Sequence, residues 1–274
     1  QEKAIELLRE KGLAAAAKKA GRIAAEGIVK AYVDTAKKVG VVIEVNAETD
    51  FVAKNADFQA FVDTCAQTVV EQNPADVDAL LACKACGSEM TIADLTTEKI
   101  QTIGENIKIR RFTRYEGDVA TYIHAGGKIG VLVDVETDVV NDAIKEMAKN
   151  VAMQAAALKP LYTNDSEVDA DYIAKEKEIL TVAAKNEKPD ANDKIISGMV
   201  MGRIKKELKE ICLLDQVYVK AEDGKQSVAQ YVAQVAKENG AKITVKKFVR
   251  FETGEGIEKK EENFAEEVAK QMAQ

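Results

Sequence analysis

The chain has 274 residues, of which 46% are hydrophobic and 31% are charged, and its formal net charge is −7. No apolar run approaches the roughly 20 residues that a membrane-spanning helix needs, so we expect no membrane insertion. The acidic charge would repel phosphates, which argues against a general nucleic-acid binder and favours protein partners.

The side chains that usually carry chemistry are scarce. The chain has one histidine, His124, and four scattered cysteines, which excludes most histidine-based sites and the disulfide framework of a small secreted domain. We therefore expect a protein of a reducing compartment that is not an enzyme and needs no cofactor and no metal.

The N-terminal stretch opens inside a helical pattern. Ile5, Leu7 and Leu8 have helical spacing, and Gly12 is the expected stop of this helix. The alanine- and lysine-rich run that follows, residues 14–25, predicts a linker with helical tendency.

A hairpin pattern occurs twice. Residues 26–45 contain two β-branched runs around a polar centre, and they align without a gap with residues 116–135. Ile109–Glu116 also resembles Val245–Glu252. Each unit is therefore predicted to be a hairpin, two helices and a strand that completes a small antiparallel sheet.

The second unit holds extra residues between its hairpin and its last strand. After a helix predicted over 138–158 and the break at Pro160, two charged helical stretches flank a Pro/Asn/Asp turn: Asp169–Lys185 and Asp193–Ile211. Such a pair predicts an antiparallel helical hairpin that projects from the body.

The C-terminal part has clearer signals. Ser227 is expected to cap a helix that runs to Glu238, and Ile243–Phe251 alternates as a strand. A last helix, Glu261–Met272, has one narrow apolar stripe, formed by Phe264, Val268 and Met272. The stripe could dock on the body or on another protein.

The predicted fold class is α+β, with a pseudo-duplicated core of two small antiparallel sheets with helices, an inserted antiparallel helical hairpin and a C-terminal helix. The expected parts are an N-terminal remnant and linker at 1–25, core subdomain 1 at 26–115, core subdomain 2 at 116–162 and 213–252, the helical hairpin at 163–212, and the C-terminal helical module at 253–274.

Two short motifs have simple structural explanations. Cys83-x-x-Cys86 lacks the further ligands that a zinc site requires. "HAGGKIG" lacks the Walker pattern, and Gly126-Gly127 fits a hairpin turn instead. His124, beside that turn, fits a solvated hairpin histidine.

The stretch "KIRRFTR", Lys108–Arg114, is basic with an interleaved aromatic residue, a pattern that could contact RNA. The alternation of inward Ile107 and Ile109 with outward Lys108 and Arg110 also fits a half-solvated strand. We favour the strand.

"NAETDFVAKN", residues 46–55, joins a strand to a helix that Asn55 should cap and that buries apolar side chains from Phe58 to Val69. Asp50 and Phe51 precede this helix. Phe51 either packs back on the helix as a staple or stays exposed as an aromatic anchor for a partner. Spacing does not separate the two alternatives.

Four segments resemble the translation elongation factor Ts family: "ETDFVAKN", "IGENIKIRR", "HAGGKIGVLV" and "RFETGEGIEK". Members are guanine-nucleotide exchange factors for elongation factor Tu. The resemblance implies that Asp50 and Phe51 wedge into that partner. It also implies contacts from Ile103, Gly104 and His124 near the phosphate-binding loop, and from the terminal helix around Met272.

The resemblance has two departures. Members normally begin with a compact N-terminal helical domain, of which we expect only the last helix here. His124 is followed by Ala125-Gly126-Gly127, whereas the family usually places glycine first.

The resemblance implies one functional expectation: the protein binds elongation factor Tu and promotes release of GDP during translation elongation. An RNA-associated module that uses the basic strands is the alternative. We expect no membrane partner, no direct nucleic-acid contact and a bacterial cytoplasmic location, with an organelle left open. A homodimer through the helical hairpin also stays open.

Overall fold

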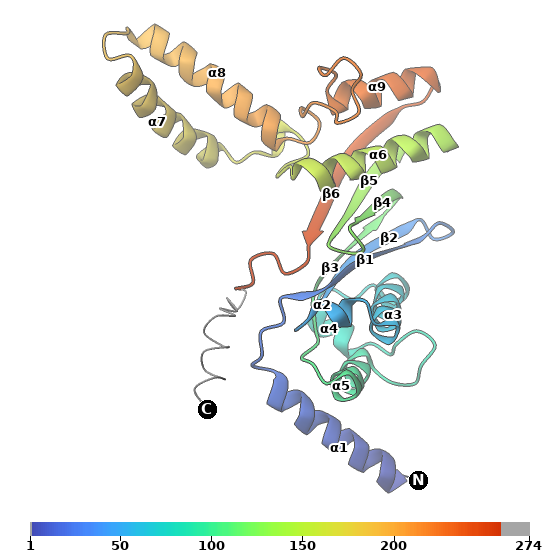
Figure 1. Cartoon of the computed structure of the whole chain (residues 1–274). Coiled ribbons are helices and arrows are strands. Elements are labelled where there is room, and N and C mark those ends of the chain that lie inside the picture. The colour runs from blue at the N-terminus through green and yellow to red at the C-terminus, as the bar shows by residue number, and fades with distance from the viewer. Residues whose placement is uncertain (1, 259–274) are drawn as a thin grey trace.

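A computed structural model describes residues 2–258 of the chain. It contains two three-stranded antiparallel sheets that face each other, with helices on their outer sides and a long helical hairpin projecting from one end (Figure 1). The predicted α+β fold class is confirmed, and the predicted helix at Glu261–Met272 lies outside the described residues. No helix within residues 2–258 is long and apolar enough to cross a membrane.

The first sheet has β2 (Val39–Ala47) at its centre, between β1 (Glu26–Asp34) and β3 (Lys108–Glu116). All nine residues of β2 are buried because both of its faces are covered. One face packs on α3 (Ala56–Gln72) and α5 (Ile92–Ile103), and the other faces the second sheet (Figure 1). The short helix α4 (Val77–Ala82) completes this outer layer.

The second sheet repeats this order. Its central strand is β5 (Ile129–Thr137), flanked by β4 (Asp118–His124) and β6 (Ile243–Glu252). Its outer face packs on α6 (Asp142–Leu158) and α9 (Val228–Glu238). The molecule is therefore a four-layer stack of helices, sheet, sheet and helices.

Side-chain caps fix where several helices begin. Asn55 accepts hydrogen bonds from the backbone N–H groups of α3, and Ser227 forms a reciprocal capping box with Gln230 in α9, so both predicted caps are confirmed. The helix predicted from residue 138 begins at Asp142 instead, because Asn141 caps it by accepting from the N–H of Ile144.

The projecting hairpin consists of α7 (Ala170–Glu187) and α8 (Asp193–Ile211), which agrees closely with the prediction. A small apolar core of its own holds the two helices together, formed by Ala184, Ile196, Val200 and Ile204. A short 3-10 turn, Asp165–Glu167, precedes α7.

The N-terminal helix differs from the prediction. Helix α1 runs without a break from Glu2 to Lys19, so Gly12 does not end it and much of the expected linker is helical. The alanine-rich run has a helix propensity high enough to carry the helix through one glycine. A Cβ at Gly12 would lie 3.0 Å from Thr97 Cγ2, which shows that Gly12 permits the close approach of α5.

The two sheets meet at a thin apolar layer in which glycines permit close packing. Val29, Val42, Leu132 and Phe251 form this layer. A Cβ at Gly130 would lie 2.3 Å from Val29 Cγ1, and a Cβ at Gly40 would lie 2.6 Å from Val119 Cγ2. Because Gly40 and Gly130 occupy equivalent positions in the sequence repeat, each sheet supplies one glycine to the same interface.

The duplication extends to an irregularity of the backbone. The pairing register of β2 with β3 shifts between Glu44 and Val45, and that of β5 with β6 shifts between Asp134 and Val135. These bulges lie at equivalent repeat positions, so both sheets bend at the same place.

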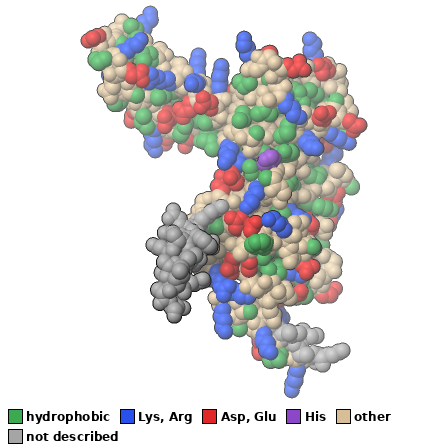
Figure 2. All heavy atoms as spheres, viewed as in Figure 1, with side chains coloured by type: hydrophobic (Ala, Val, Ile, Leu, Met, Phe, Trp, Pro, Cys, Tyr) green, Lys and Arg blue, Asp and Glu red, His purple; other side chains and the backbone are tan. Residues whose placement is uncertain are grey.

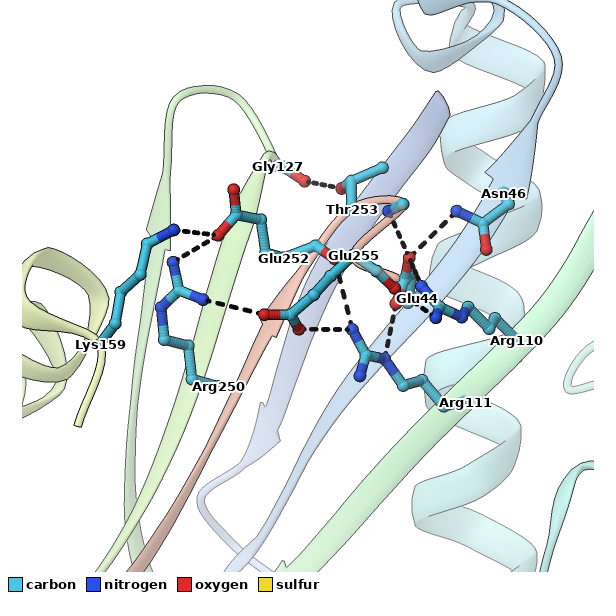
Figure 3. Close-up of polar contacts among 11 residues, drawn as sticks. Glu44, Asn46, Arg110, Arg111, Gly127, Lys159, Arg250, Glu252, Thr253 and Glu255 are labelled. Atoms are coloured by element: carbon cyan, nitrogen blue, oxygen red, sulfur yellow. Dashed lines mark hydrogen bonds and ion pairs between the residues drawn. The ribbon is translucent and has the colours of Figure 1, made fainter. Parts of the chain in front are cut away.

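A buried carboxylate joins the first sheet to the segment after β6 (Figure 3). The Glu44 side chain is 0% exposed and accepts from Arg111 Nε at 2.6 Å, from Arg110 Nη1 at 3.2 Å and from the backbone N–H of Gly254 at 2.8 Å. Gly254 has a φ of +74°, and a Cβ there would lie 2.0 Å from the carbonyl oxygen of Ala25. The backbone of the segment after β6 thus packs directly against the backbone at the start of the first sheet.

We predict that Gly130→Ala destabilises the fold, because the added methyl group must displace Val29 in a closed interface. The free energy of unfolding should fall by about 1–3 kcal/mol, measured by urea unfolding. Gly202→Ala is the matched control, because its Cβ would meet no atom within 4 Å on the exposed face of α8. Since alanine favours a helix more than glycine does, this substitution should raise the free energy of unfolding by roughly 0.5–1 kcal/mol. Equal stability of the Gly130→Ala protein and the wild type would contradict this packing.

A second prediction concerns acid. Hydrogen bonds from Lys159 and Arg250 hold the pKa of Glu252 at about 2. Since this pKa lies below the unfolded value of about 4.3, Glu252 stabilises the fold above that pH and the contribution is lost as the pH falls toward 2. Glu252→Gln should therefore cost roughly 1 kcal/mol or less at pH 7 because the site is partly exposed. Unfolding free energies measured between pH 7 and pH 2 should converge for the two proteins; a constant difference would refute the assignment.

Candidate partner-binding surface

The segment after β2 exposes a large aromatic side chain. Asp50–Ala53 form a four-residue helix, α2, which refines the prediction of a plain connection. Val52 points into the first core and is 7% exposed, whereas Phe51 is 79% exposed. Of the two alternatives left open for Phe51, the structure excludes the staple, because Val52 takes the buried position and Phe51 faces solvent.

Two charges accompany this ring. Lys54 Nζ lies 3.0 Å from Asp50 Oδ2 and 5.9 Å from the centre of the Phe51 ring. The hydrogen bond from Lys54, with a smaller electrostatic contribution from Lys128, lowers the pKa of Asp50. Asp50 is therefore ionised at neutral pH and presents a negative charge beside an exposed apolar ring.

The end of α5 lies next to α2. Gly104 ends this helix in the left-handed region with a φ of +88°, and its N–H donates to the carbonyl of Ile100 at 3.1 Å. Gly104 is exposed, and the half-buried Ile103 packs on the first core. The following residue, Glu105, hydrogen-bonds to the segment that leads into α2.

His124 is exposed at the end of β4, and its Nδ1 lies 3.2 Å from the hydroxyl oxygen of Tyr122. The turn that follows docks on the start of β1. A Cβ at Gly127 would lie 2.2 Å from Ile28 Cγ1, and Lys128 Nζ lies 2.7 Å from Glu26 Oε2. The predicted hairpin turn with positive φ at Gly126 and Gly127 is confirmed.

Three predicted elements thus meet at one end of the paired sheets: α2 with Asp50 and Phe51, the end of α5 with Ile103 and Gly104, and the β4–β5 turn beside His124. Glu105 joins the first two elements. Lys128 of the turn binds Glu26, which pairs with Ala47 at the end of β2, so the turn lies near the segment that leads into α2. Met272, the remaining predicted contact residue, lies outside the described residues.

The cysteine motif carries no sign of a metal centre. Cys83 and Cys86 are free and half-buried. Within residues 2–258, no group of three or more His, Cys, Asp or Glu side chains could hold a metal ion.

Sequence reasoning missed the polar residues that support this surface. Glu44, Glu48 and Glu105 each bind groups more than 50 positions away in the chain. Glu44 stands out as an acidic residue in an apolar run, whereas Glu48 and Glu105 lie in polar stretches. For all three, spacing does not reveal partners so distant in sequence.

Comparisons with known proteins agree with this architecture. A sequence profile described as "Elongation factor TS" matches residues 48–255. Elongation factor Ts of Clostridium botulinum (strain Eklund 17B / Type B) is 53% identical over 275 residues, which cover 99% of this chain and 89% of that protein. Elongation factor Ts of Clostridium acetobutylicum is 50% identical over 277 residues, with coverage of 100% and 89%.

The chain belongs to the elongation factor Ts family. Elongation factor Ts of Clostridium perfringens (strain 13 / Type A), 53% identical over 98% of this chain and 88% of that protein, supports the same assignment. The family resemblance found in the sequence is thus confirmed, and the protein is a translation elongation factor by family. The profile begins at Glu48, directly before α2, and ends at Glu255, in the segment bound by Glu44 and its arginines.

The exposure of Phe51 generates a stability prediction. Phe51→Ala should change the free energy of unfolding by no more than about 0.5 kcal/mol, because the ring buries little surface in the free protein. Phe58→Ala, at a fully buried position seven residues later, should cost about 3–5 kcal/mol. Urea unfolding of the two variants provides the test. A large loss of stability in Phe51→Ala would restore the staple interpretation.

Proposed function

We propose that this protein binds elongation factor Tu and promotes release of its GDP, with Phe51 as the main anchor. The observation that carries the proposal is the 79% exposure of Phe51 on a helix fixed by the buried Val52. A large aromatic ring held in water by a rigid support has the properties of a binding hot spot. Membership of the elongation factor Ts family supports the identity of the partner.

Exchange of this kind requires no bond chemistry in the factor. A factor that binds the nucleotide-free partner more tightly than the loaded form must weaken nucleotide binding by the same ratio, because coupling between two ligands is reciprocal. A tenfold ratio corresponds to about 1.4 kcal/mol of differential contact. The factor therefore needs contacts that form fully only after the nucleotide site has rearranged.

The charge beside the ring gives the anchor a second action. Asp50 is ionised and exposed, so it can compete for cations or hydrogen-bond donors that hold the partner's nucleotide phosphates. His124 and Gly104 flank α2 and extend the same contact surface. In this scheme Phe51 contributes affinity for the rearranged partner, and Asp50 weakens its hold on the nucleotide.

The basic strands, which motivated the RNA alternative, have internal explanations. Five of their seven basic side chains pair with carboxylates of the same chain: Arg110 and Arg111 with Glu44, Arg114 with Glu116, Lys246 with Glu136, and Arg250 with Glu252. On the face shown in Figure 2, basic and acidic side chains are interspersed. A phosphate backbone would have to displace these pairs, so we favour the protein partner.

Replacing both anchor residues tests the proposal. Asp50→Ala combined with Phe51→Ala should slow factor-stimulated release of labelled GDP from elongation factor Tu by roughly tenfold or more, because it removes the differential contact. Leu161→Ala is the matched control, since Leu161 is 66% exposed but lies outside the proposed surface. It should exchange at the wild-type rate.

The same experiment can reject the proposal. If the double variant keeps wild-type thermal stability and wild-type exchange, Asp50 and Phe51 do not form the anchor. If the wild-type protein itself fails to accelerate GDP release, and binds RNA with a steep salt dependence, the RNA alternative replaces it.

A further inference from the structure

Two loops that lie far apart in sequence are joined by reciprocal hydrogen bonds at the N-terminal end of α2, in which a carboxylate of each loop accepts from the backbone of the other. Glu105 Oε2 accepts from the backbone N–H groups of Glu48 and Thr49, each at 3.0 Å, and Glu105 Oε1 accepts from Thr49 Oγ1 at 2.6 Å. In return, Glu48 Oε1 accepts from the backbone N–H of Asn106 at 2.6 Å. We call these four residues, Glu48, Thr49, Glu105 and Asn106, the carboxylate brace.

The brace is reciprocal in the way that a helix capping box is, although it joins two separate segments. Each acidic side chain satisfies backbone N–H groups of the other loop, and hydrogen bonds to an ionised acceptor are short and strong. Asn106 is 8% exposed and Glu48 has a side-chain exposure of 22%, so water competes weakly for these groups. The two loops therefore hold each other in one arrangement.

Helix α2 depends on this support. It has four residues, too few for a helix to persist on its own. Its N-cap residue, Thr49, makes no side-chain cap to its own helix, because the hydroxyl group donates to Glu105. The contacts of Glu105 hold the N-terminal end of α2, and Val52 anchors the helix in the core. At the other end, Gln59 Nε2 donates to the carbonyl oxygen of Ala53 at 2.9 Å.

The segment after α1 is tied to the same point. Asn106 Nδ2 donates to the carbonyl oxygen of Arg22 at 2.8 Å, and Arg22 Nη1 lies 3.5 Å from Glu48 Oε1. Three separate parts of the chain thus converge on the brace, which makes it a fixed reference rather than a flexible loop contact.

We infer that Glu105 is a positioning residue that holds Phe51 in the place and direction needed for partner binding. Phe51 is two residues after Thr49, and Gly104 is the immediate neighbour of Glu105, so the brace fixes the distance between two elements of the proposed surface. An aromatic anchor held in its bound orientation loses less conformational entropy on binding than a mobile one. This inference rests on the proposed exchange function.

The geometry distinguishes two substitutions at this position. Glu105→Ala removes every acceptor and frees the base of α2. Glu105→Gln can keep all three contacts, with its amide oxygen accepting from the two N–H groups and its NH2 group donating to the hydroxyl oxygen of Thr49. If position rather than charge matters, glutamine should rescue what alanine loses.

The chain has no tryptophan, so a tryptophan introduced at position 51 reports on α2 alone. In a Phe51→Trp protein, the time-resolved fluorescence anisotropy of the introduced indole measures the mobility of this side chain on α2 in the absence of any partner. Adding Glu105→Ala should lower the residual anisotropy, and adding Glu105→Gln should restore it. Glu98→Ala, which removes an acidic side chain of α5 outside the brace, should leave the anisotropy unchanged.

Exchange kinetics complete the test. In the native Phe51 background, Glu105→Ala should slow release of labelled GDP from elongation factor Tu by roughly tenfold, mainly by raising the factor concentration needed for half-maximal rate. In a Phe51→Ala background the same substitution should have little further effect, because the positioned ring is gone. If Glu105→Ala does not fold, Thr49→Val removes one contact of the brace and serves in its place.

The inference and the proposed function can fail separately. Unchanged anisotropy in Glu105→Ala, or an equal slowing of release with and without Phe51, would overturn the positioning role. Absence of stimulated GDP release by the wild-type protein would overturn the exchange function, whatever the anisotropy shows.

Discussion

The structure depends on one buried charge. Glu44 is fully enclosed, and an ionised carboxylate in such a place is tolerated only when charged and polar partners surround it. Asn46 of the same strand donates one hydrogen bond to it, and its other partners come from β3 and from the segment after β6. Glu44 therefore gains all its partners only when both ends of the chain's core have assembled. Removing one member of a buried pair typically costs about 3–5 kcal/mol. This joint therefore fixes how the last strand and the first sheet meet.

The internal duplication shows where the candidate site was added to a repeated frame. In the first unit, 11 positions separate Glu44 from the helix cap Asn55 (55 − 44 = 11), whereas in the second, 7 separate Asp134 from the cap Asn141 (141 − 134 = 7). The difference of four residues equals the length of α2. The unit that carries α2 also has the fully buried carboxylate, whereas the half-exposed Asp134 has a pKa raised by desolvation. Shared backbone supplies the frame, and the inserted turn supplies the exposed ring.

Local patterns predicted much of this fold, because they depend on neighbours in sequence. The repeat indicated two sheets, Asn55 and Ser227 marked helix starts, and the bounds of α8 follow from its charged, capped pattern. Predictions failed where tertiary contacts decide. Gly12 is tolerated inside α1 through its contact with α5, and Phe51 could not be assigned to core or surface until Val52 was seen to take the buried position. Glu105 had no visible role, since its partners lie 56 and 57 positions away.

The exposed Phe51 ring leaves free energy of burial unused in the fold. Burying a phenylalanine side chain contributes about 1.5–3 kcal/mol. A one-residue rotation of α2 would bury Phe51 and expose Val52, so folding would gain the difference between the two side chains. The contacts of Glu48 and Thr49 with Glu105 oppose that rotation. Free energy withheld from folding in this way stays available for a partner's pocket. An exchange factor needs such a reserve, because contacts that its partner offers equally with and without nucleotide cannot shift nucleotide binding. A rigid, exposed ring can bind more tightly to one of the partner's two states, with or without nucleotide. A ring buried in its own protein could not.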